Sequence, residues 1–284
     1  MKHRGQRSSE SAVGTTLIEP SRRSLLHALV ELWAHRELTL FLIWRDIKVR
    51  YKQTLLGAAW AIIQPVVLMV IFSLVFGQLG HLPSNGVPYP IFSYAALLPW
   101  TLFAEGLVGA SASVVGNATL VSKVYVARLC LPVAAALSAL IDFAFACIAL
   151  AVLMVYYGVT PTLNILWIPL LLLLALVTAL GVGIWLAALN VRYRDFQYVV
   201  PFVVQVWLFA TPVAYSSTLI PHQWRLLYAL NPMAGVVEGF RWALLGTHTQ
   251  PGGMIAVSSA TALLVLGAGV LYFKRAERTF ADVI

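Results

Sequence analysis

The stretch that decides the fold runs from Leu38 to Pro65 and reads LTLFLIWRDIKVRYKQTLLGAAWAIIQP. Its first half carries apolar residues at helical spacing, namely Leu40, Trp44, Ile47, Tyr51 and Leu55. The cations on another face of the same helix are Arg45, Lys48 and Lys52. An apolar stripe with an aromatic anchor and a cationic face is typical of a helix lying flat in a membrane interface. Because an apolar run from Ala58 to Gly77 follows, we expect the chain to bend at Gly57 and enter the bilayer.

The composition of the whole chain points the same way. Its 284 residues are 60% hydrophobic and only 11% charged, whereas a soluble domain has about 45–50% apolar and about 25% charged residues. A soluble protein with a large core would need charged surface helices, and the apolar runs here lack them. The sequence therefore predicts an all-α polytopic membrane protein.

Apolar runs and breaks divide the chain. We expect a mobile cytoplasmic tail over 1–24, an amphipathic interfacial helix over 25–57, a transmembrane domain over 58–273 and a cytoplasmic tail over 274–284. The six expected spans are roughly Ala58–Gln78, Ile91–Gly116, Pro132–Tyr157, Ile165–Asn190, Tyr198–Leu219 and Met254–Phe273.

Two connecting segments have a character of their own. Asn117–Leu131 is too polar to span and too apolar for a free loop, which predicts a short helix at the interface. Ile220–Gln250 is apolar but interrupted at Asn231-Pro232, so we expect two half-helices that form a re-entrant hairpin before the last span.

The positive charges set the orientation. Of the 19 Lys and Arg residues, only Arg225 and Arg241 lie on the side opposite the two termini. Positively charged loops stay in the cytoplasm, so both termini are expected there. The net charge of +8 is then a matter of topology, and no nucleic-acid partner is expected.

Nucleotide and metal chemistry find no support in the sequence. It has no G-x-x-x-x-G-K-[ST] motif and no cytoplasmic stretch long enough for a nucleotide-binding domain. If the protein pumps, a separate chain must bind ATP. The histidines are scattered, and Cys130 and Cys147 are far apart, so no metal site is expected.

Two acids, Glu105 and Asp142, fall inside expected spans. An ionisable residue in the bilayer is a candidate for function, and the alternative is a polar pair that locks helices together. No intramembrane base accompanies these acids in the expected spans, which argues against a proton relay.

Polar and aromatic residues share faces on two expected spans. The fifth span carries Tyr198, Phe202, Gln205 and Phe209 at helical spacing, and the first carries Trp60 and Gln64. Such a stripe faces lipid or core, or it lines a channel whose aromatic walls stack on sugar rings; both interpretations stay open.

Six segments together resemble the membrane subunit of ABC-2 type exporters, in the branch that exports O-antigen or teichoic acid. They are WRDIKVRYKQTLLGAAWAIIQP at 44–65, LLPWTLF at 97–103, NATLVSKVY at 117–125, VRYRD at 191–195, TPVAY at 211–215 and NPMAGVVEGFR at 231–241. The resemblance covers roughly residues 38–246. The family often has Phe-Pro-Arg where this chain has Val-Ala-Arg at 126–128.

The resemblance implies a homodimer of six-span subunits with two copies of a separate ATPase that holds ATP and Mg. The pore would form between the subunits from the first and fifth spans, and the hairpin would gate its external end. The implied ATPase-coupling residues are Asn117, Lys123, Tyr125 and Arg128, and the implied gate residues are Asn231, Pro232, Glu238 and Arg241. The expected substrate is a lipid-linked polysaccharide, moved to the outer leaflet of the bacterial inner membrane.

The interfacial cations leave two roles open. Arg45, Lys48, Arg50 and Lys52 would meet the pyrophosphate of a lipid carrier, or they would anchor the helix to anionic lipid heads. Two other functions compete with polysaccharide export. They are export of a drug or small lipid by the same fold, and an integral membrane enzyme acting on polyprenyl-linked substrates, for which paired acids or a metal motif are missing.

Overall fold

The computed structural model describes residues 25–52, 57–123, 127–247 and 251–280. Within these ranges five helical segments are long and apolar enough to cross a membrane. They are α3 with the π-helical turn η1 (Ala59–Leu79), α4 (Tyr89–Gly116), α6 (Cys130–Tyr156), the 3-10 turn η2 with α7 (Leu163–Arg192) and α11 (Gly252–Ala276). This chain is therefore a helical, multi-pass membrane protein, as its composition predicts.

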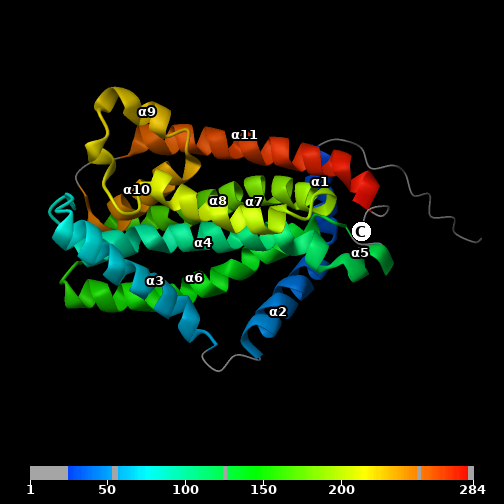
Figure 1. The fold of residues 1–284 in the computed structure, drawn as a ribbon, viewed down its shortest axis with the longest axis horizontal. Helices are drawn as coiled ribbons and strands as arrows, with labels where there is room; N and C mark the ends of the chain where they lie inside the picture. The colour runs from blue at the N-terminus through cyan, green and yellow to red at the C-terminus, as the bar shows by residue number, and fades with distance from the viewer. Residues whose placement is uncertain (1–24, 53–56, 124–126, 248–250, 281–284) are drawn as a thin grey trace, which may run out of the picture.

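The long helices form a bundle around α4. It is the most buried of the five and packs on α7, α6, α10 (Pro232–Leu245) and α3. Figure 1 shows α4, α6, α7 and α11 lying lengthwise along the molecule. One end carries α1 (Leu25–Ala34), α5 (Ala118–Lys123) and the end of α11, and this is the expected cytoplasmic end.

Small residues allow the central helices to pack closely. A Cβ atom on Gly183 of α7 would lie 2.7 Å from the Cβ of Ala110 on α4. On the other side of α7, a Cβ on Gly269 of α11 would collide with the carbonyl oxygen of Gly181. Lipid tails supply no hydrophobic force between helices, so such close backbone approach is what holds spans together.

The N-terminal helices differ from a single helix lying flat. The helical conformation is interrupted at His35, so α1 is followed by a separate helix, α2 (Arg36–Lys52). The helix α2 packs against α6 and buries Thr39 and Leu42, and Figure 1 shows it running obliquely to α6 and away from the bundle. Apolar side chains such as Trp44 and Val49 stay exposed on its outer sides.

The elbow itself agrees with the sequence. Gly57 has a positive φ of 39°, a conformation that glycine adopts without steric cost. From there α3 runs into the bundle and buries Pro65, Met69 and Phe72. Residues 53–56 lie outside the described part of the chain.

The fifth expected span is shorter than predicted. The helix α8 (Phe196–Ala210) has 15 residues, about 22 Å at 1.5 Å per residue, against a hydrocarbon core of about 30 Å. It ends because Pro212 disfavours a helical conformation at Thr211, whose backbone is extended. Expected residues up to Leu219 instead form turns, including η3 (Ser217–Leu219).

The two connecting segments are also less regular than expected. The first half of the hairpin contains only the turn η4 (His222–Trp224) and the four-residue α9 (Arg225–Tyr228), while α10 is a full helix of 14 residues. Between Asn117 and Leu131 the structure describes the six-residue α5 and the start of α6 at Cys130, rather than one helix.

Candidate functional site

A cavity of about 530 Å³ lies between the end of α2 and the first turns of α3, and we call it the elbow groove. Its walls come from α2, α3, α4, α6 and α8. The residues that give it chemical character are Arg50, Tyr51, Trp60, Gln64, Glu105 and Asp142. The groove thus combines an aromatic ring, an amide and four ionisable groups from segments far apart in the sequence.

Four of these residues form one polar cluster, which we call the Arg50 cluster: Arg50, Tyr51, Glu105 and Asp142. The Arg50 guanidinium donates to one carboxylate oxygen of Asp142, and the Tyr51 hydroxyl donates to the other. The guanidinium also lies 3.9 Å from a carboxylate oxygen of Glu105. Because Asp142 lies 12 residues into α6 and Glu105 is midway along α4, the cluster ties α2 to two spans.

The cluster faces the groove rather than a dry core. The Arg50 and Glu105 side chains are 41% and 36% exposed, whereas that of Asp142 is 11% exposed. Burial, followed by the hydrogen bond to Asp142, raises the pKa of Tyr51 above its ordinary value. The Tyr51 hydroxyl therefore keeps its proton at neutral pH and stays a donor to Asp142.

Sequence reasoning missed this pairing. It assigned Arg50 to lipid headgroups and Tyr51 to an apolar stripe, and it expected no charged partner beside the acids. The structure instead brings Arg50 to both acids. A signal was present, because a carboxylate within a span demands a cation, and α2 supplies basic residues near the elbow.

The other three interfacial cations do not enter the groove. Arg45 pairs with its neighbour Asp46 at 2.8 Å. The Lys48 ammonium lies 5.1 Å from the ring centroid of Trp44, and Lys52 is exposed at the end of α2.

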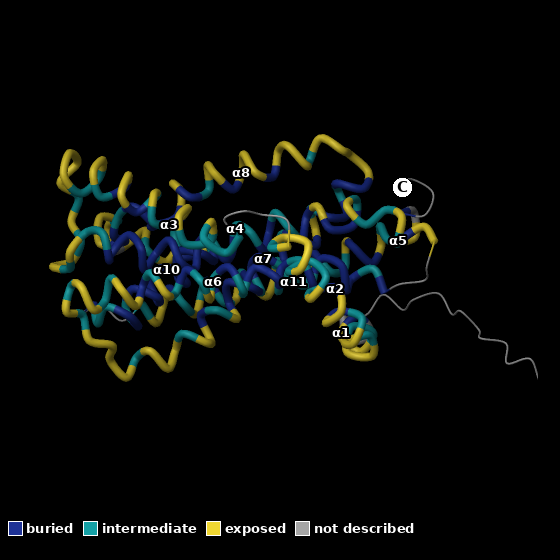
Figure 2. Tube along the Cα trace, turned by 90° about the horizontal axis from the view of Figure 1, so that it is seen from below, coloured by how far each residue is buried: buried dark blue, intermediate teal, exposed yellow. Residues whose placement is uncertain are grey.

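The predicted pore residues divide between two surfaces. Trp60 and Gln64 line the elbow groove on α3. On α8 the stripe faces away from the bundle: Tyr198, Phe202 and Phe209 are 75%, 66% and 53% exposed, and Gln205 is also exposed. The opposite face, with Val200, Val204 and Leu208, is buried. Figure 2 shows α8 along one edge of the molecule, with exposed positions alternating with buried ones. Within one chain, the aromatic stripe and the groove lie on different sides of α8.

Of the expected coupling residues, Arg128 contacts the segment that follows α11. Asn117 caps α4 by donating to the Ser113 carbonyl at 2.7 Å, and Lys123 is exposed at the end of α5. Arg128 donates to the backbone carbonyl of Glu277 and lies over the ring of Phe280. Tyr125 lies outside the described residues.

A buried ion pair lies in the same region, beside Arg128 and Glu277. The Lys274 ammonium at the end of α11 lies 2.7 Å from Glu31 of α1 and 3.0 Å from Glu277. The first and last described helices are therefore held together next to Arg128. Sequence reasoning gave Lys274 and Glu31 no role.

The expected gate residues make contacts that anchor α10. The Asn231 side chain caps α10 by accepting from the Met233 amide, and Pro232 occupies the first turn. Arg241 is fully buried and donates to the carbonyl oxygens of Phe92, Pro212, Val213 and Tyr215. Glu238 pairs with Arg241 at 3.3 Å and accepts from the Ser217 amide.

Comparisons with known proteins cover most of the chain. The model of the ABC-2 type transporter family matches residues 37–245. The O-antigen export system permease protein RfbA of Myxococcus xanthus is 30% identical over 264 residues, which cover 92% of this chain and 100% of that protein. RfbA of Klebsiella pneumoniae is 26% identical, over 84% of this chain and 92% of its own length. The polysialic acid transport protein KpsM of Escherichia coli is 22% identical, over 82% and 91% respectively.

These matches confirm the resemblance carried by the six sequence segments. The family match begins at the start of α2 and ends with α10, so it contains the elbow, the Arg50 cluster and the hairpin. The chain belongs to the ABC-2 type transporter family.

Proposed function

We propose that this chain is the membrane-spanning permease subunit of an ATP-driven exporter of lipid-linked polysaccharide, such as O-antigen. The observation that carries the proposal is its similarity to an O-antigen export permease over that protein's entire length. KpsM, the other similar protein, is named for the transport of polysialic acid, which is also a polysaccharide.

The geometry suits such a cargo. The α8 stripe offers three aromatic rings and an amide on one exposed face. Aromatic faces stack on the apolar faces of sugar rings, and amides hydrogen-bond to hydroxyls, so this combination suits a glycan better than a purely apolar molecule. Trp60 and Gln64 repeat the combination in the elbow groove.

An exposed aromatic face needs either lipid or a second protein surface. We place the α8 stripe at the interface of a homodimer, where α3 and α8 of both subunits enclose the polysaccharide path. Six spans per subunit then require α8, with the turns after it, to cross the bilayer despite its 15 residues. The hairpin with α10 would close the external end, and both termini would lie in the cytoplasm of the inner membrane.

Two copies of a separate ATPase subunit supply the energy. ATP and Mg bind to that subunit rather than to this chain. This chain then acts as a transport subunit and not as an enzyme. The ATPase is expected to contact α5 and the residues in and around it, namely Asn117, Lys123, Tyr125 and Arg128. Closure of the ATPases would move α5 and the Lys274 ion pair beside it, which joins α1 to α11. The motion would then reach the groove along α2, because Arg50 links α2 to Asp142 and Glu105.

The elbow also suits a phosphorylated lipid carrier. Since Arg50 is engaged by two acids and Arg45 is paired with Asp46, the cations left to meet a pyrophosphate are Lys48 and Lys52. This assigns phosphate binding to the outer surface of α2 and sugar binding to the groove.

Gene deletion tests the proposed function. Cells lacking the chain should lose surface polysaccharide and accumulate lipid-linked glycan in the cytoplasmic leaflet, and the intact gene should restore export. Unchanged surface glycan together with loss of a small-lipid or drug efflux activity would contradict the proposal.

A further inference from the structure

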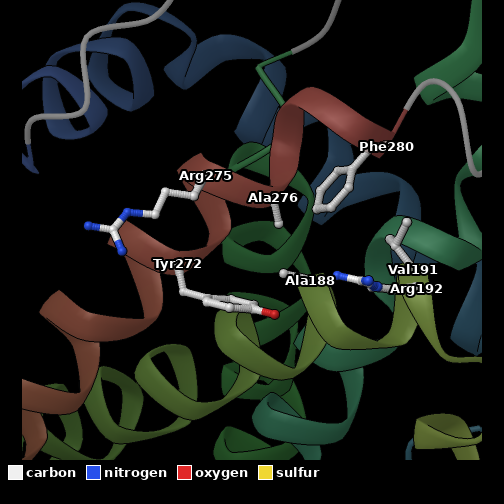
Figure 3. Close-up of a pocket in the computed structure, with 7 residues that line it drawn as sticks. All are labelled: Ala188, Val191, Arg192, Tyr272, Arg275, Ala276 and Phe280. Carbon is white, nitrogen blue, oxygen red and sulfur yellow. The ribbon is translucent and has the colours of Figure 1, made fainter.

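A second cavity, of about 560 Å³, lies between the expected cytoplasmic ends of α7 and α11. Its walls come from the last turn of α7, the last turns of α11 and Phe280 beyond it. Figure 3 shows its seven lining residues, with Arg192 and the Tyr272 hydroxyl directed toward the cavity, whereas the Arg275 guanidinium extends away from the other six. We call it the α7–α11 wedge; it is separate from the elbow groove and has no role in the proposed transport path.

The shape of the wedge follows from how the two helices pack. They touch at Gly181 and Gly269, where a Cβ on Gly269 would collide with the opposite carbonyl. About one turn closer to the cytoplasmic end, the rings of Trp185 and Tyr272 fill the space between the helices, with centroids 6.5 Å apart. The cavity lies beyond that contact, between the last turns of the two helices.

Two partly exposed aromatic rings lie next to the wedge. Tyr272 lines the wedge, and its ring contacts that of Trp185. The two side chains are 37% and 46% exposed, respectively. Amphipathic rings at this level of a span mark the boundary between hydrocarbon and headgroups. A lipid whose headgroup entered the wedge would therefore have its acyl chains alongside these rings.

The charge of the wedge is positive. Arg192 and Arg275 are both exposed. Among the described residues, no Asp or Glu lines the cavity, and no carboxylate is within ion-pair distance of either guanidinium. The nearby Glu277 is already paired with Lys274. The ends of the two helices contribute only partial negative charge, which two full positive charges exceed.

From this arrangement we propose that the α7–α11 wedge binds the phosphate of an anionic phospholipid of the cytoplasmic leaflet. A guanidinium pairs with phosphate through two parallel hydrogen bonds, and the Tyr272 hydroxyl would add a third donor. Basic pockets between spans on the cytoplasmic side are suited to anionic headgroups, and about 560 Å³ is in the range of small-ligand pockets. The apolar remainder of the wall, which includes Val191 and Phe280, fits the glycerol and first methylene groups.

The test compares two double variants that lose the same charge. In Arg192→Gln/Arg275→Gln the wedge is neutral, whereas Arg194→Gln/Arg278→Gln removes two exposed arginines that lie next to it in sequence but do not line it. Purified full-length protein in detergent is titrated with phosphatidylglycerol, or with phosphatidylcholine of the same chains, and bound lipids are counted by native mass spectrometry. Size-exclusion profiles and melting temperatures establish that both variants are folded.

We expect the unaltered protein and the Arg194/Arg278 variant to bind one phosphatidylglycerol in preference to phosphatidylcholine. The wedge variant should bind it about 25-fold more weakly, since each of the two cations contributes roughly a fivefold factor near a membrane surface. Three results would overturn the proposal: equal binding by all proteins, equal weakening in both variants, or displacement of the lipid by millimolar inorganic phosphate. Undiminished lipid binding with loss of a co-purifying ATPase only in the wedge variant would also overturn it, because the wedge would then be a protein-docking surface.

Discussion

Separating Arg50 from Asp142 should uncouple the interfacial helix from the spans. The contribution of the Arg50–Asp142 ion pair to stability lies between two limits. Removing one partner of a buried ion pair costs about 3–5 kcal/mol, while an exposed pair contributes about 0–1 kcal/mol. With Asp142 11% exposed and Arg50 41% exposed, an intermediate coupling energy of about 2 kcal/mol follows from these limits.

A double-mutant cycle measures that coupling. Arg50→Gln leaves Asp142 and Glu105 without their cation, and Asp142→Asn leaves Arg50 with Glu105 alone. For a domain of this order of size, about 2 kcal/mol corresponds to a fall of about 4–8 °C in melting temperature for each single variant. The double variant should be more stable than the sum of the two single effects predicts, by the same coupling energy.

Export of polysaccharide is the functional assay for the same variants. We expect Arg50→Gln to lower surface glycan at least about fivefold, the equivalent of about 1 kcal/mol, because motion of α2 no longer reaches α4 and α6. The control pair is Arg45 and Asp46, which forms an ion pair of 2.8 Å within α2 alone. Arg45→Gln and Asp46→Asn should leave stability within about 0.5 kcal/mol and export unchanged. Additive effects of Arg50→Gln and Asp142→Asn, or equal loss of export in the control variants, would refute the reasoning.

Three further predictions concern how the helices are held. Arg241→Leu removes the donor of four carbonyl oxygens and the cation that pairs with Glu238, so it should destabilise by about 3–5 kcal/mol; a monodisperse protein with an unchanged melting temperature would contradict this. Gly269→Ala should cost about 1–3 kcal/mol because its Cβ meets the Gly181 carbonyl, whereas Gly116→Ala, with open space around it, should not destabilise. Lys274→Gln should speed hydrogen exchange in α1, because Glu31 loses its ion pair; exchange equal to that of the unaltered protein would count against the contact.

Local chemistry made much of the fold predictable. Long apolar runs predicted five spans to within a few residues, the bend at Gly57 matches its positive φ, and Asn231-Pro232 begins α10 as an N-cap and first turn should. In these places the residues that decide the conformation are neighbours in the sequence. The early end of α8 is also a local effect, because Pro212 follows directly after the extended residue Thr211.

The polar sites were less predictable because they depend on packing between distant segments. Nothing near Arg50 in the sequence indicates a partner 92 residues away, and the pair of Lys274 with Glu31 spans 243 positions. The role of Arg241 was also hidden. The hairpin motif drew attention to it, but only the fold reveals that four carbonyls from other segments converge on its guanidinium.

The most direct measurement of the central claim is translocation in proteoliposomes that contain the purified chain and its ATPase. A lipid-linked glycan is placed in the outer leaflet beside outward-facing ATPases, and its transfer to the inner leaflet is followed after ATP is added. We predict transfer that requires both proteins and ATP, and that falls when Tyr198 and Phe202 are replaced by Ala, without a fall in melting temperature, because both rings are exposed. ATP-dependent movement of a small lipid or drug, with no movement of the glycan-bearing lipid, would contradict the account.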